Sequence, residues 1–120
     1  MITGTANAGG ISAAGLNDPI GVATDGQGHL YVADTGNNRL LEYDAPLTSD
    51  RAADRVFGQP SMLTGTANIG GVSALSLNFP TAAALDAQGN LYLADDSNNR
   101  VLEFDRPLPL LGLFLPLLLR

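Results

Sequence analysis

The side chains able to do chemistry in this chain are few, and the most distinctive of them occur in two matching sets. The first set is Asp34, Asn37, Asn38 and Arg39, and the second is Asp95, Asn98, Asn99 and Arg100. An aspartate in such a segment can accept hydrogen bonds from the amides of a following turn, and the arginine can pair with it. The same groups could instead hold a ligand. Because a feature present in both copies more often builds a repeat than forms one site, we expect a structural role.

Other residues offer little catalytic chemistry. His29 is the only histidine, and its counterpart in the second copy is Asn90, so we expect an exposed position beside a hairpin turn. Asp95 opens a segment like a calcium loop, but Arg100 and Arg106 stand where that loop needs its glycine and its bidentate glutamate. We therefore predict no catalytic, cofactor-binding or metal-binding residue, no cofactor and no enzyme activity.

The composition limits the partners. Twelve acidic residues and six arginines, with no lysine, give a formal net charge of −6, so we expect no nucleic-acid partner. The absence of cysteine excludes disulfides but leaves the compartment open. The apolar run 108–119 is interrupted by proline and glycine and is shorter than the roughly 20 residues that span a bilayer, so we expect no membrane span. The first residues do not have the pattern of a signal peptide.

An internal repeat organises the chain. Residues 3–47 align with 64–108 without a gap, and 28 of the 45 positions are identical. Met1 falls opposite Met62, so we expect that the chain opens within a repeat and is a fragment. The division that follows is a first unit with its preceding loop at 1–60, a connection and second unit at 61–108, and an apolar tail at 109–120 that offers an outer strand or covers an exposed face.

Short apolar segments separated by turn residues predict strands in both copies. The predicted strands are 20–25, 29–34, 39–44, 55–59, 81–86, 90–95 and 100–105. We expect positive φ at Gly28 and Gly89 and in the Asn37/Asn38 and Asn98/Asn99 pairs, so that Asn37→Val or Asn98→Val would be destabilising. The strands are apolar on both faces, which indicates sheets stacked on one another.

The segments 34–39 and 95–100, each preceded by Leu-Tyr-Val/Leu-Ala, resemble the NHL repeat signature, and the resemblance covers about 20–44 and 81–105. It implies an all-β fold of two four-stranded blades of a β-propeller, as an incomplete ring, since such propellers usually have six blades. The spacing of 61 residues exceeds the ~40 to 50 usual for propeller repeats and is similar to long-repeat bacterial NHL proteins. For a full-length parent of that kind the resemblance implies an extracellular or cell-envelope location.

The resemblance implies a binding or scaffold module for a protein or a small ligand. The alternatives are a fragment of a propeller-type hydrolase or lyase that is inactive alone, and a truncated product without function. A pocket with convergent ionisable residues would favour the enzyme fragment. Two blades also leave two apolar sheet faces uncovered, so we expect self-association.

Overall fold

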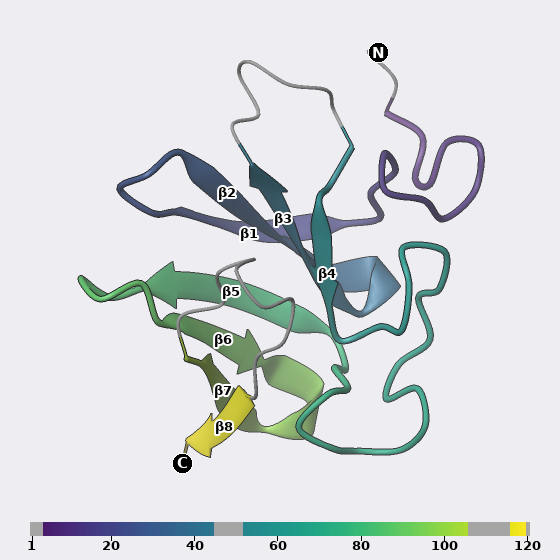
Figure 1. Cartoon of the computed structure of the whole chain (residues 1–120). Coiled ribbons are helices and arrows are strands. Elements are labelled where there is room, and N and C mark those ends of the chain that lie inside the picture. Colours follow the sequence, from purple (N-terminus) through teal and green to yellow (C-terminus); the bar gives the residue numbers. More distant parts are fainter. Residues whose placement is uncertain (1–3, 45–51, 106–115, 120) are drawn as a thin grey trace.

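The computed structural model describes residues 4–44, 52–105 and 116–119, which form two antiparallel sheets stacked face to face (Figure 1). Blade 1 is the sheet β1-β2-β3-β4 and blade 2 is the sheet β5-β6-β7-β8. The strands of blade 1 are β1 (Pro19–Thr24), β2 (His29–Asp34), β3 (Arg39–Asp44) and β4 (Arg55–Phe57). Those of blade 2 are β5 (Pro80–Leu85), β6 (Leu91–Asp95), β7 (Arg100–Phe104) and β8 (Pro116–Leu119).

The fold class predicted from the sequence is confirmed. The only helical elements among the described residues are two single 3₁₀ turns, η1 (Thr35–Asn37) and η2 (Asp96–Asn98). Each follows the second strand of its blade, and the two sheets do not close into a ring. No described helix is long and apolar enough to cross a membrane.

The predicted strands agree with the structure to within one residue, except for the outer strand of blade 1. That strand was expected over 55–59, but β4 ends at Phe57. The reason is local, because Gly58 has φ +92, a left-handed conformation that takes the chain out of the sheet. Gly28 and Gly89 have φ +94 and +86 in the two hairpin turns, as predicted.

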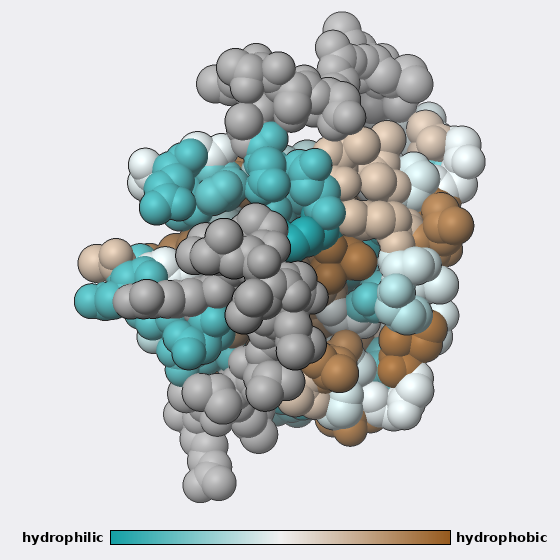
Figure 2. Space-filling model, viewed as in Figure 1, coloured by the Kyte–Doolittle hydropathy of each residue, from teal (hydrophilic) through white to brown (hydrophobic). Residues whose placement is uncertain are grey.

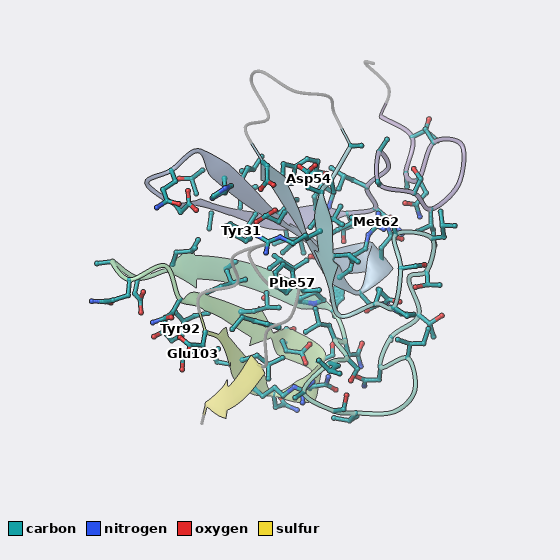
Figure 3. All side chains as sticks on the ribbon, in the orientation of Figure 1. Tyr31, Asp54, Phe57, Met62, Tyr92 and Glu103 are labelled. Carbon is teal, nitrogen blue, oxygen red and sulfur yellow. The ribbon has the colours of Figure 1, made fainter. Side chains whose placement is uncertain are left out.

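The two blades pack so that one face of blade 1 covers the opposite face of blade 2. Because strand residues alternate between faces, Tyr31 and Ala33 of β2 point toward blade 2. They pack against Leu91 and Leu93 of β6. The counterparts of these two leucines in blade 1, 61 residues earlier, point away from blade 2. Phe57, labelled in Figure 3, comes from blade 1. Its ring meets that of Phe104 edge to face across the interface, with ring centroids 5.0 Å apart. The buried core cluster is Tyr31, Ala33, Leu40, Phe57, Leu77, Leu91, Leu93, Leu102 and Phe104.

Part of the expected apolar tail forms the fourth strand of blade 2. Strand β8 pairs antiparallel with β7, in the place that β4 takes beside β3. The pairing differs by one residue, since Leu40 lies opposite Phe57 but its counterpart Val101 lies opposite Leu119. The rest of the tail, the loop 45–51 and Arg106 of the rejected calcium loop lie outside the described residues.

Candidate functional site

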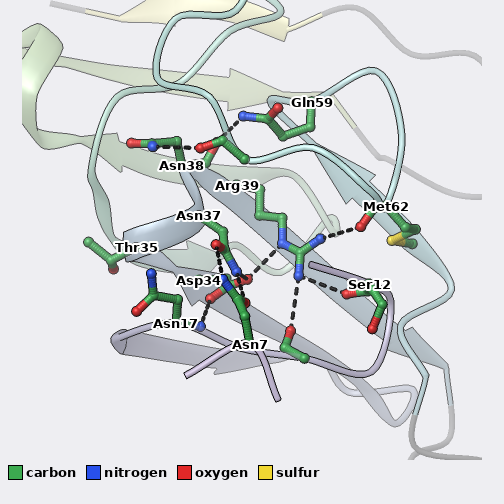
Figure 4. A network of polar contacts seen from close by, with 12 residues as sticks. Asn7, Ser12, Asn17, Asp34, Thr35, Asn37, Asn38, Arg39, Gln59 and Met62 are labelled. Atoms are coloured by element: carbon green, nitrogen blue, oxygen red, sulfur yellow. Dashed lines mark hydrogen bonds and ion pairs between the residues drawn. The ribbon is translucent and has the colours of Figure 1, made fainter. Parts of the chain in front are cut away.

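The buried pair of Asp34 and Arg39 is the centre of a polar network at the end of blade 1 (Figure 4). Both side chains are fully buried, and Arg39 Nε donates to Asp34 Oδ2 at 2.6 Å. Arg39 Nη1 donates to the carbonyl of Met62, and Nη2 donates to the carbonyls of Ser12 and Gly15. The arginine therefore ties the segment before blade 1, the blade itself and the connection after it to one carboxylate.

Asn37 belongs to the same network. The positive φ angle predicted for it is wrong. Its Nδ2 donates to Asp34 Oδ2 at 2.8 Å and to Asn7 Oδ1 at 2.7 Å. Positive φ occurs at Asn38 and Asn99, at 54° and 55°, and not at Asn37 or Asn98. The physical reason is that residues 35–37 form a 3₁₀ turn, so the left-handed residue is the one that caps it.

Asn38 and Thr35 join this network to the second blade. Asn38 Oδ1 accepts the backbone N–H of Phe79 at 2.8 Å, and its Nδ2 donates to the carbonyl of Gly65. The hydroxyl of Thr35 donates to the carbonyl of Pro80 at 2.6 Å. The role of Thr35 could not be predicted from the repeat, because its counterpart Asp96 is of a different residue type.

Blade 2 repeats the inner part of the network. Arg100 Nε donates to Asp95 Oδ2 at 2.8 Å, and Asn98 Nδ2 donates to the same oxygen at 2.7 Å. Arg100 Nη2 donates to the carbonyl of Ser76, the counterpart of Gly15. Asn99 is exposed, unlike Asn38, because among the described residues no third blade follows. In both copies these side chains hold parts of the fold together.

The comparison with known families decides what this repeated unit is. Residues 16–43, which run from the segment before β1 into β3 and include the Asp34 and Arg39 pair, match the model described as NHL repeat. Blade 1 carries an NHL repeat. The resemblance drawn from the sequence is confirmed for this segment, and the chain is a propeller-type module. No curated protein matches the chain.

The first hairpin of the NHL repeat places His29 differently from the exposed position expected for it. Its side chain is 18% exposed, with Nδ1 2.5 Å from Asp25 Oδ2 and Nε2 3.6 Å from Asp44 Oδ1. Burial acts to raise the pKa of Asp25, but hydrogen bonds from His29 and Gln27 outweigh it, so this pKa lies below its usual value. In the second copy, Asn90 Nδ2 donates to Asp86 Oδ2 at 3.0 Å, which is equivalent to the contact between His29 and Asp25.

A cavity of about 450 Å³ lies where β4, the outer strand of blade 1, meets the connection to blade 2. Phe57 and Phe104 come from the facing sheets, and Ile69 and Leu75 come from the connection. The remaining lining residues are Val56, Gly58, Gln59, Pro60 and Gly70. None of these side chains carries a charge, so the cavity offers apolar contact and no acid or base.

The one polar side chain of the cavity is already occupied. Gln59 Nε2 donates to the carbonyls of Asn38 and Thr66, both at 2.9 Å, and its Oε1 accepts the hydroxyl of Thr64 at 2.8 Å. These bonds fix the start of the connection against the signature turn. In the part of the chain that the structure describes, no group of three acidic or histidine side chains is arranged to hold a metal ion.

Proposed function

We propose that the chain is a binding module, and that the cavity between β4 and the connection receives an apolar side chain from an extended segment of a partner protein. The observation that supports this most directly is the exposure of Leu75, which is 67% exposed at the edge of an apolar cavity. An exposed leucine gains free energy when a partner removes it from water. The volume lies within the range of roughly 300 to 1,000 Å³ of concave, mostly apolar binding sites in proteins.

The connection extends the apolar surface beyond the cavity. Val72 and Leu63 are 65% and 70% exposed. Figure 2 shows brown, hydrophobic atoms along the side of the molecule that the connection forms in Figure 1. Because scattered apolar side chains are common on protein surfaces, only those beside the cavity support the proposal.

The chemistry of the lining favours an apolar protein segment over a polar small molecule. A polar ligand needs hydrogen-bonding groups that fix its orientation. Among the described lining residues, Gln59 alone has a side chain with such groups, and its amide hydrogens and oxygen are engaged within the fold. Leu75 and Ile69 instead offer contacts that depend on shape and burial.

We do not propose catalysis for this chain, and the hydrolase or lyase fragment stays the weaker alternative. None of the described residues that line the cavity has an ionisable side chain. His29, the one imidazole, has its two nitrogens facing the carboxylates of Asp25 and Asp44 at a hairpin turn. These contacts support a role of His29 in holding the turn.

Selection from a peptide display library on the immobilised chain tests the proposal, with Leu75→Asp as the variant and Leu63→Asp as its control. Both leucines are exposed to a similar degree, but only Leu75 lines the cavity. We expect peptides with apolar anchors that bind the wild type and the Leu63→Asp variant but not Leu75→Asp. Equal binding to both variants, or no selected peptide, would contradict the proposal.

A further inference from the structure

The outward side of blade 2 consists of the counterparts of residues that are buried in blade 1. Leu40 is fully buried between the blades, whereas its counterpart Val101 is 39% exposed. Thr35 is fully buried, and its counterpart Asp96 is exposed. The outward side of blade 2 is therefore equivalent, in the repeat, to the face of blade 1 that packs against blade 2.

The complementary surface is also exposed, on strand β1. In blade 2 the corresponding strand β5 packs against β1 and β2, and Pro80 is buried there. In blade 1 the counterpart Pro19 is exposed, and Ile20 and Val22 are 54% and 67% exposed. Val32 and Leu41, the counterparts of Leu93 and Leu102, are already buried in blade 1, so the free part of this half is strand β1. One molecule thus carries the β1 part of one half, and the other half on the outward side of blade 2, of an interface whose packed form lies between its own blades (Figure 1).

We propose that a second copy of this chain stacks its strand β1 on the outward side of blade 2, and that Ala82 and Asp96 keep this homotypic contact weak. Because the two surfaces are different and lie at opposite ends of one molecule, the contact is head to tail, and its repetition gives open assemblies unless the rotation closes a ring.

Ala82 opposes the contact through its methyl group. Its counterpart Gly21 lies where a Cβ atom would be 2.5 Å from the backbone oxygen of Thr81 and 3.0 Å from the Cα of Ala82. Real Cβ atoms essentially never come within 3.0 Å of such atoms, so the closest approach of the two blades depends on glycine. A blade stacked on Ala82 in the same geometry has to shift outward, which weakens the packing.

Asp96 opposes the contact through its charge. In the packed interface the hydroxyl of Thr35 donates to the carbonyl of Pro80. In the stacked copy the corresponding carbonyl is that of Pro19, and the carboxylate of Asp96 has no proton to donate to it. Bringing two acceptors together and removing the carboxylate from water is unfavourable.

Asn99 retains what the contact needs. In the packed interface Asn38 Oδ1 accepts the backbone N–H of Phe79. Asn99 has nearly the same backbone angles as Asn38, and Asp18, the counterpart of Phe79, has φ 53° where Phe79 has 57°. Asn99 of one molecule can therefore accept the N–H of Asp18 of the next.

Sedimentation velocity over a range of concentrations tests the proposal on the wild type and on Ala82→Gly, Asp96→Thr and the double variant. Each substitution installs the residue that blade 1 has. We expect weak association of the wild type and a dissociation constant for the double variant lower by about tenfold or more. Circular dichroism confirms that the variants are folded.

Adding Val22→Asp to the double variant identifies the surface. Val22 is exposed, so its replacement leaves the fold intact, but it places a charge on the stacking strand. Leu63→Asp is the matched control, since it changes a similarly exposed leucine that lies in the connection between the blades and in no strand. We expect Val22→Asp to reverse the gain and Leu63→Asp to leave it. An unchanged dissociation constant in the double variant, or a gain that persists with Val22→Asp, would overturn the proposal.

Discussion

Blades 1 and 2 have nearly the same signature residues in nearly the same backbone, yet the environments of these residues differ. Arg39 is fully buried and donates to four acceptors, whereas Arg100 is 11% exposed and donates to two in the described contacts. The inner hydrogen bonds of the turn are the same in both copies. The repeat therefore specifies the blade, and the neighbouring segments determine how much each residue contributes to stability.

The largest predicted difference concerns the two arginines. Arg39→Ala removes the partner of a fully buried carboxylate and three further hydrogen bonds to carbonyl groups, and we expect a loss of about 3 to 5 kcal/mol in unfolding free energy. Arg100→Ala removes fewer bonds at a partly exposed site, and we expect about 2 kcal/mol. Urea unfolding followed by tyrosine fluorescence measures both. Equal losses would show that the added contacts of Arg39 do not matter.

Leu40 and Val101 occupy equivalent positions in the third strand of each blade but differ in burial. Substituting both therefore shows the effect of burial between the blades at a matched sequence position. Leu40 is fully buried between the blades, so Leu40→Ala creates a cavity, and we expect a cost of about 2 to 5 kcal/mol. Val101 is its counterpart on the outward side, and Val101→Ala is expected to change the unfolding free energy by less than about 0.5 kcal/mol. The same urea experiments decide, and a large effect of Val101→Ala would mean that this side is covered in solution.

Much of the fold was predictable because each pattern of apolar and turn residues occurs in both copies of the repeat. The hairpin glycines and the limits of β2 and β3 follow from repeated apolar segments between repeated turn residues. The roles of Gly21 and Thr35 were not predictable, since both depend on a contact between blades that one strand does not encode. The position of His29 against two carboxylates was missed for a different reason, because Asp44 lies opposite it on the neighbouring strand β3 of the same blade.

The candidate cavity was less accessible to prediction than the signature turns. Its lining residues come from β4, the connection and β7, so no single segment carries the pattern. The sequence indicated only a long connection with turn residues. The error at Asn37 has a different origin, since an Asn-Asn pair is compatible with a left-handed residue at either position and the 3₁₀ turn selects the second.

Asn38 and Asn99, which cap the two 3₁₀ turns, are expected to differ by an intermediate amount in their effect on stability. Glycine adopts positive φ without strain, so Asn→Gly at these positions removes only the side-chain contacts. Asn38→Gly leaves the N–H of Phe79 and the carbonyl of Gly65 without their partners, and we expect a loss of about 1 to 2 kcal/mol. Asn99→Gly is expected to be neutral to within about 0.5 kcal/mol. Thermal unfolding of the two variants side by side checks this, and similar shifts would argue against the bridging role of Asn38.

The smallest expected effect lies in the two matching tyrosines. The hydroxyl of Tyr92 lies 3.1 Å from Asp86 Oδ2 and 3.3 Å from Glu103 Oε2, so its single proton is shared between the two carboxylates. The bond to Asp86, with loss of hydration and the nearby carboxylates, raises the pKa of Tyr92 to about 12. For Tyr31 burial is the main cause of a raised pKa, the Arg55 charge opposes it, and Asp25 adds less.

Substituting the two aspartates separates these causes. Asp86→Asn is expected to lower the pKa of Tyr92 toward its ordinary value near 10, while Asp25→Asn changes that of Tyr31 much less. Because the pKa of Tyr92 is raised in the folded state, its contribution to stability is present below about pH 10 and is lost as pH rises from there to about 12. Absorbance at the phenolate band during alkaline titration, with Tyr92→Phe to assign the step, measures both shifts. Equal shifts in the two variants would mean that Asp25 raises the pKa of Tyr31 as strongly as Asp86 raises that of Tyr92. Burial between the blades would then not be the main cause of the raised pKa of Tyr31.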